Sequence, residues 1–114
     1  MEATLVLKQR GDVAIVDVLG RITLAGGSSI LRDEIRNLVD NGQKKLLLNM
    51  SCVKYIDTSD IGESVSALTY TCNHGGQLKL LNLTKRTKDL LQITHHYTDF
   101  EVFDDEAIAL RSFH

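Results

Sequence analysis

The sequence predicts an α/β protein, in which helices cover a mixed β-sheet. Short apolar segments of strand length alternate with longer segments whose apolar residues recur at helical spacing. The first two strand-like segments, around Leu5–Leu7 and Val13–Leu19, are separated by Gly11-Asp12, which is typical of a tight antiparallel turn. The chain is therefore expected to form one domain over residues 1–114 with the order β-β-α-β-α-β-α-β-α, about five strands and about four helices.

The first helix is expected after a glycine-rich loop. Val13–Leu19 is apolar on both faces, as a central strand should be, and residues 20–27 form the loop that follows it. Ser28 or Ser29 is the expected cap, and Asn41-Gly42 is the expected end, since both residues tolerate a left-handed backbone. The apolar residues at helical spacing between these signals are Leu31, Ile35, Leu38 and Val39.

The most informative stretch covers residues 45–72. The run Lys45–Met50 is apolar on both faces, which favours a buried strand in a parallel sheet. After Ser59 the apolar residues recur at spacings of four, three and four, which predicts a helix with the inward stripe Ile61, Val65, Leu68 and Cys72. Asp57, Thr58 and Ser59 lie where the strand pattern changes to the helix pattern.

Asp57, Thr58 and Ser59 have two interpretations. The first turn of a helix has unpaired backbone N–H groups, and the side-chain oxygens of these residues are common caps for them. The second interpretation is a phosphorylation site on one of the hydroxyls, because the helix dipole favours the negative charge that a phosphate adds. The residues alone leave both open.

The remaining elements follow from similar signals. His74-Gly75-Gly76 ends the second helix, and Gln77–Leu81 is the next strand. Thr84 is the expected cap of the third helix, the last strand lies around Phe100–Phe103, and Asp104 or Asp105 caps the terminal helix. The apolar residues that these two helices are expected to use are Leu90, Leu91 and Ile93 in the third and Ala107, Ile108 and Leu110 in the terminal one.

Composition excludes several classes of function. Hydrophobic residues make up 43% and charged residues 25%, as in ordinary soluble domains. A net charge of −2, with no basic run longer than Lys44-Lys45 or Lys85-Arg86, argues against direct nucleic-acid binding. No apolar segment approaches the ~20 residues that cross a membrane, and no signal-peptide pattern opens the chain, so a cytoplasmic location without membrane insertion is expected. Cys52 and Cys72 fit no metal or redox spacing.

No catalytic, cofactor or metal site is expected. Of the four histidines, His74 follows a helix, His114 is terminal, and the adjacent His95 and His96 point in different directions. The sequence Gly-Gly-Ser-Ser at residues 26–29 lacks the lysine of a phosphate-binding loop. We therefore expect a binding module, not an enzyme.

The segment from Leu48 to Gly62 resembles the signature of STAS domains, which include the bacterial anti-sigma factor antagonists. In that signature an apolar strand and a loop lead to Asp-Ser-Ser/Thr-Gly-Leu-Gly at the start of a helix. Asp57 matches the Asp and Thr58 the phosphorylated Ser, followed by the further matches Ser59, Ile61 and Gly62. The order of elements also fits, so the resemblance covers nearly the whole chain. This sequence departs from the signature in having Thr58 for Ser and Asp60 for Gly.

The resemblance implies a mixed sheet whose first strand runs against the others, and a function in transcription regulation by partner switching. It implies that the unphosphorylated domain binds an anti-sigma factor that is also a serine/threonine kinase. Phosphorylation at Thr58, or alternatively at Ser59, would release the complex, and a phosphatase would reset it. The implied partner-binding residues are Thr23, Leu24, Asp57, Ser59, Asp60 and Glu63.

A second function is also open. STAS domains occur as permanent docking subunits in signalling assemblies and beside lipid transporters, without phospho-switching. Asp60 favours this alternative, because its carboxylate already supplies charge near the acceptor. In either case the chain is expected to be a monomer or a weak dimer.

Overall fold

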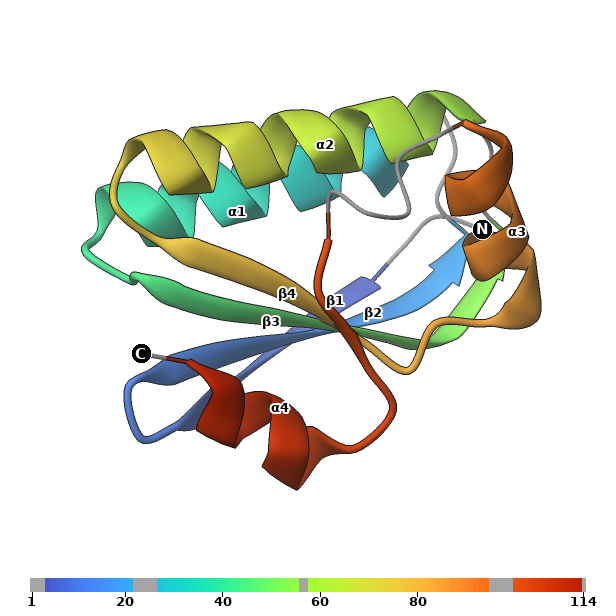
Figure 1. Ribbon diagram of the computed structural model, residues 1–114. Coiled ribbons are helices and arrows are strands. Elements are labelled where there is room, and N and C mark those ends of the chain that lie inside the picture. Colours follow the sequence, from blue (N-terminus) through green and yellow to red (C-terminus); the bar gives the residue numbers. More distant parts are fainter. Residues whose placement is uncertain (1–3, 22–26, 56–57, 95–99, 114) are drawn as a thin grey trace.

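The computed structural model describes residues 4–21, 27–55, 58–94 and 100–113 (Figure 1). For residues 21, 27–30, 54–55, 58–61 and 63 it describes the backbone only. The order of elements agrees with the prediction from the sequence. The elements are β1 (Thr4–Arg10), β2 (Val13–Arg21), α1 (Gly27–Asp40), β3 (Lys45–Tyr55), α2 (Thr58–Asn73), β4 (Gln77–Leu81), α3 (Lys85–Ile93), β5 (Val102–Phe103) and α4 (Glu106–Ser112).

The five strands form one mixed sheet in the order β1-β2-β3-β4-β5. β1 pairs with β2 in antiparallel fashion, and the other neighbouring pairs are parallel. Helices α1 and α2 lie side by side on one face of the sheet, and α4 lies on the opposite face (Figure 1). The predicted fold class and the antiparallel first strand are therefore confirmed.

The core has two parts, one on each face of the sheet. The alternation of side chains along β2 sends Val16 toward α1 and α2, and Ile15 toward α4; both are fully buried. This explains why the central strands are apolar at nearly every position. The larger part lies under α1 and α2, and the smaller part, under α4, contains Val13, Ile15, Leu47, Leu81 and Ala109.

Local capping signals account for three of the helix ends. α1 ends at Asp40, and Gly42, with φ of 94°, allows the amide of Gln43 to donate to the carbonyl of Leu38 at 3.0 Å. The Thr84 hydroxyl accepts from the amide of Thr87, and the Asp105 carboxylate accepts from the amide of Ile108. The expected cap at Ser28 or Ser29 is wrong, because α1 already begins at Gly27.

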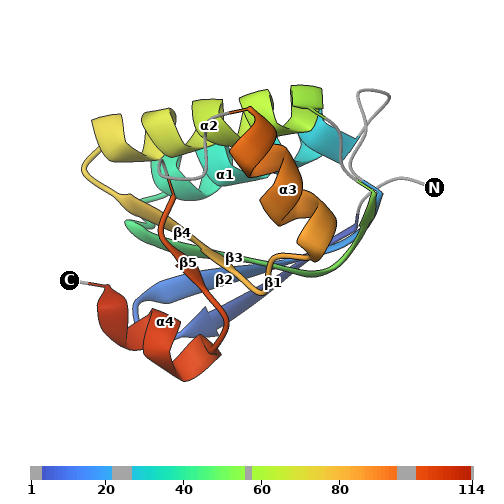
Figure 2. The same cartoon turned by 45° about the vertical axis from the view of Figure 1, so that its right-hand side comes forward.

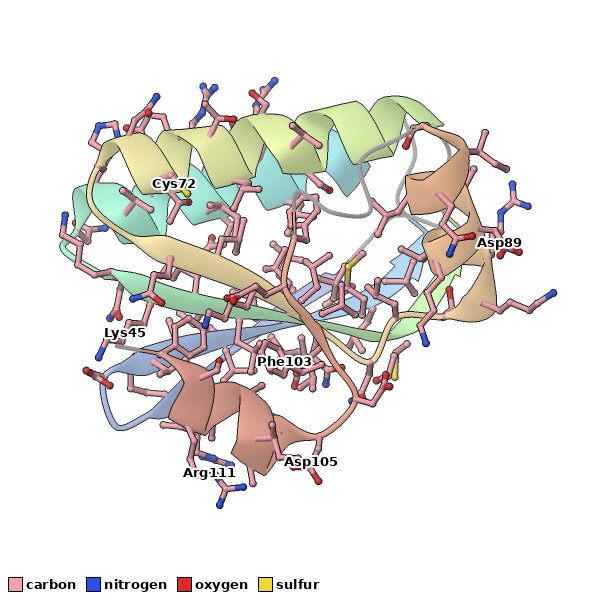
Figure 3. The ribbon with its side chains drawn as sticks, in the orientation of Figure 1. Lys45, Cys72, Asp89, Phe103, Asp105 and Arg111 are labelled. Carbon is pink, nitrogen blue, oxygen red and sulfur yellow. The ribbon has the colours of Figure 1, made fainter. Side chains whose placement is uncertain are left out.

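Packing rotates the helices differently from the expected apolar stripes. Among the side chains of α2 that the structure describes, Ser64, Ala67 and Thr71 are buried, whereas Cys72 is exposed on the surface (Figure 3). The side chain of Ile61, the first residue of the expected stripe, lies outside the described part of the structure. Small residues let a helix approach the sheet closely, so they, and not Cys72, face the strands. Val65 and Leu68 remain partly buried at the side of the core.

The two C-terminal helices show the same effect. In α3, Thr87 and Leu91 face the core, which leaves Ile93 on the opposite side with 70% of its surface exposed. In α4, Ala109 faces the sheet, so Ile108 points away and is 51% exposed. The expectation that Ile108 points inward is therefore wrong, as is the same expectation for Ala107, which is exposed.

Lys79 joins α4 to the sheet through a buried ammonium group. Its Nζ donates to the carbonyl and to the hydroxyl of Ser112 at 2.9 and 3.0 Å, and it forms an ion pair with Glu101 at 2.8 Å. The ammonium also lies over the rings of Phe113 and Phe103, and Phe103 sits between the sheet and α4 (Figure 3). Five interactions thus hold a charge whose side chain is only 5% exposed.

Candidate partner-binding site

The candidate site lies at the carboxyl ends of the parallel strands. β2 ends at Arg21 and β3 ends at Tyr55, and these two residues are partners in the sheet. α2 begins three residues after Tyr55, at Thr58. Ligand and partner sites of open α/β sheets commonly lie at this edge, because the loops that leave the strands gather there.

Thr58, Ser59 and Asp60 are the first three residues of α2, and Glu63 follows in its second turn. The sequence placed Thr58 and Ser59 at the change from strand to helix, and the helix begins at that point. The backbone N–H groups of the first turn have no partners within the helix, so this end of α2 can accept an anion or a carboxylate. The side chains of these four residues lie outside the described part of the structure.

Gly62 leaves the surface of the second turn of α2 open. It is exposed, and a Cβ built on it would meet no atom within 4 Å. Glycine is unfavourable inside a helix by about 0.8–1 kcal/mol relative to alanine, and here no close contact within the domain requires it. Packing within the domain therefore does not explain a glycine at this position.

The end of β2 is irregular where it approaches this site. Its pairing with β3 shifts between Asp17 and Leu19, and again between Gly20 and Arg21. Gly20 has a φ of 92°, a conformation that residues with a side chain rarely adopt. Shifts of this kind end the regular pairing and redirect the strand, and they are frequent beside functional loops. Here they precede residues 22–26.

The expected partner-binding residues fall into two groups. Ser59, Asp60 and Glu63 lie on the first two turns of α2 with Thr58, as the sequence predicted. Thr23, Leu24 and Asp57 lie outside the described residues. The position of these three residues therefore stays a prediction.

α3 presents exposed side chains beside α2 that the sequence analysis did not assign to a site. It packs beside α2 on the same side of the sheet (Figure 2), and Ile93 at its C-terminal end is 70% exposed. Its first turn is basic, and the side chain of Lys85 is 93% exposed with only a 4.0 Å ion pair to Asp89. The exposure of Ile93 was detectable in principle, since Leu91 and Ile93 are 200° apart on a helical wheel.

Two depressions in the described surface, and one carboxyl group with a lowered pKa, lie away from this site. The hydrogen bond that the Lys45 ammonium donates to Asp12 lowers the pKa of that carboxyl group. Asp12 lies in the turn between β1 and β2, at the opposite end of the parallel strands. A depression of about 410 Å³ at that end is lined by Asp12, Lys45 and the turn after α1. Another, of about 200 Å³, lies beside β4 and includes Cys72.

Two further features concern the described residues only. Among them, no group of three histidine, cysteine, aspartate or glutamate side chains is placed to hold a metal ion. Within the same residues, no helix is long and apolar enough to cross a membrane.

The family model for the STAS domain matches residues 4–109. The chain belongs to the STAS domain family. The match runs from the start of β1 into α4, so the family fold accounts for the complete sheet and for the helices on both of its faces.

Solved structures with this STAS fold include anti-sigma factor antagonists. One from Mycobacterium paratuberculosis is 16% identical, with a TM-score of 0.85 and coverage of 97% of this chain and 93% of that chain. SpoIIAA, an anti-sigma factor antagonist solved in its unphosphorylated form, is 15% identical, with a TM-score of 0.78 and coverage of 94% and 93%. SpoIIAA of Bacillus has also been solved in a phosphorylated form.

The same fold occurs inside a much larger protein. The murine anion transporter Slc26a9 is 21% identical over 91% of this chain and 18% of that chain, with a TM-score of 0.72. At these identities the likeness establishes the fold that the proteins share, and the fold alone.

Proposed function

We propose that this STAS domain is an anti-sigma factor antagonist that regulates transcription by partner switching, with Thr58 as the phosphorylated residue. One observation carries the proposal: Thr58, which matches the acceptor of the antagonist signature, is the first residue of α2, at the carboxyl edge of the sheet. The solved antagonists with the same fold support the assignment.

The chemistry of a helix start explains why phosphorylation would change binding without unfolding the domain. A phosphate adds about −1.5 to −2 charges, which the dipole and the unpaired N–H groups of the first turn of α2 stabilise. The core under α2, formed by Ala67 and its neighbours, is two turns away from Thr58 and is untouched. A partner docked on the same turn would meet new charge and bulk, and would be released.

The proposed partners follow from this role. The unphosphorylated domain binds an anti-sigma factor that is also a serine/threonine kinase, and a phosphatase restores the binding state in the cytoplasm. The contact residues proposed beside Thr58 are Thr23, Leu24, Asp57, Ser59, Asp60 and Glu63. Catalysis belongs to these partners, and the domain itself acts as a binding module.

The test is phosphopeptide mapping and intact-mass measurement of the protein isolated from its own cells. We expect one phosphate on Thr58, lost in Thr58→Ala and retained in Ser59→Ala, which is the matched control one residue along the same turn. A phosphate that is lost only in Ser59→Ala would move the acceptor by one residue. Absence of phosphate under every growth condition would rule out the switch.

The alternative function is a constitutive docking subunit of a signalling assembly or transport system. It is favoured by Asp60, which already places a carboxylate in the first turn of α2, and by the occurrence of the fold within the transporter Slc26a9. A complex isolated from cells distinguishes the two functions. Partner switching predicts that binding responds to phosphatase treatment, whereas a constitutive subunit binds equally before and after it.

A further inference from the structure

The two edges of the sheet differ in how they are protected against pairing with another strand. An edge strand presents unpaired N–H and C=O groups, and proteins commonly protect it by making it short or charged. β5 is protected in this way, since it has two residues and is flanked by Glu101 and Asp104. β1, at the other edge, has seven residues and pairs with β2 without any shift in register.

The first half of β1 is both apolar and exposed. Val6 is 40% exposed and Leu7 is 51% exposed. Val6 lies opposite Asp17, on the α4 face, whereas Leu7 lies opposite Val16, on the face of α1 and α2. Apolar surface is therefore available on both faces of the same strand edge, which is typical of a site that pairs with another chain.

The charge on β1 does not block such pairing. The ammonium group of Lys8 is held at 2.8 Å by the carboxylate of Asp17, which is only 14% exposed in its side chain. Asn49 donates a hydrogen bond to the other oxygen of the same carboxylate at 3.0 Å. Lys8 is thus directed toward β2, where the carboxylate of Asp17 offsets its charge, and its side chain keeps 44% of its surface exposed.

We propose that β1 pairs with β1 of a second copy of this chain, in antiparallel fashion about a twofold axis at Val6. In this register Val6 lies opposite Val6 of the second copy, and Leu5 lies opposite Leu7. Each of the three apolar residues of β1 therefore meets an apolar residue on the same face, and Thr4 meets Lys8. Registers centred on Leu5 or Leu7 place Val6 opposite Thr4 or Lys8 and lose this match.

The pairing joins two five-stranded sheets into one continuous sheet. Because it uses about five residues of a single strand, its area falls at the low end of protein interfaces, below about 1,200 Å². The dimer is therefore weak and depends on concentration. The carboxyl ends of β2 and β3 take no part in the pairing, so the dimer does not depend on the function proposed for α2.

The first test is sedimentation velocity from micromolar to millimolar concentrations. We expect the wild type to pass from monomer to dimer, and Val6→Lys to weaken association at least tenfold by placing two ammonium groups at the twofold axis. The fold should tolerate this change, because Val6 faces Asp17 across β1 and β2. Ile108→Lys, at a position that is 51% exposed on α4, is the matched control and should associate like the wild type.

The second test reports the register and needs no charged variant. Cys52 and Cys72 are free and exposed, so both are first changed to serine. In that background Val6→Cys should form a disulfide-linked dimer on mild oxidation with diamide. Gln9→Cys should not, because the two copies of Gln9 are about 20 Å apart in this register.

Three results would overturn the proposal. They are a wild-type monomer at every concentration, equal association of the wild type and Val6→Lys, and equal cross-linking at Val6 and Gln9.

Discussion

Replacement of Gly62 by alanine separates the stability of the domain from the function of its surface. Gly62 is the fifth residue of α2, so the exchange removes the cost of a glycine inside a helix, about 0.8–1 kcal/mol. The new methyl group would meet no atom within 4 Å, so it neither clashes nor fills a cavity. We therefore expect Gly62→Ala to raise the free energy of unfolding by about 0.5–1 kcal/mol.

The assay is urea and thermal unfolding of the isolated domain. For a chain of this size the change corresponds to an increase in Tm of about 2–6 °C. Gly76→Ala is the matched control, since its Cβ would lie 2.9 Å from the Cγ2 of Thr71 and 3.0 Å from the carbonyl oxygen of Lys44. We expect that variant to lose about 1–3 kcal/mol through overpacking.

An unchanged or lowered Tm for Gly62→Ala would refute the reasoning, because it would mean that the glycine is required by the fold. A second readout concerns binding. If a partner docks on this turn, the added methyl group lowers the affinity of the more stable variant. Stabilisation together with unchanged affinity would remove Gly62 from the proposed contact surface.

Three further predictions concern the rest of the domain. Lys79→Met keeps the apolar stem but loses the charge-assisted bonds that hold the end of α4, so urea unfolding should show a loss of about 1–3 kcal/mol, and an unchanged midpoint would contradict this role. The hydrogen bond that Tyr70 donates to Asp40 at 2.5 Å raises the pKa of Tyr70, so this bond contributes stability below pH ~10 and loses it as pH rises through the raised pKa. Ultraviolet titration should show a lower pKa for Tyr70 in Asp40→Asn, with Tyr70→Phe identifying its signal among the tyrosines. Thr84→Ala removes the cap that accepts from the amide of Thr87 and should cost about 0.5–2 kcal/mol in thermal unfolding, and a cost below that range would argue against the cap.

Much of the site could be predicted from the sequence because its signals are local. The change of apolar period after Ser59 indicates where a strand gives way to a helix, and the structure begins α2 at Thr58. The sequence did not reveal which other elements end beside the start of α2. The pairing of Arg21 with Tyr55 unites the ends of two strands more than thirty residues apart in the chain, and only the register of the sheet decides it.

The sequence by itself determined the order of elements, the position of the central strands and the cap at Thr84, and it limited the cap of the terminal helix to Asp104 or Asp105. These depend on backbone geometry and on the side chains nearby in the chain. Only the tertiary structure decided which side of each helix is buried, as Cys72 and Ile108 show. The reason is that a helix can rotate about its axis at little local cost, so its orientation is set by the surface against which it packs.

The burial of Lys79 and the exposure of β1 have the same origin. A lysine in a strand is expected at the surface, and it becomes buried here because α4 folds over it and supplies its hydrogen-bond acceptors. Val6 and Leu7 resemble core residues in sequence, yet they are exposed because β1 is an outer strand of the described sheet. Position within the sheet is a property of the whole fold, so no local pattern carries it.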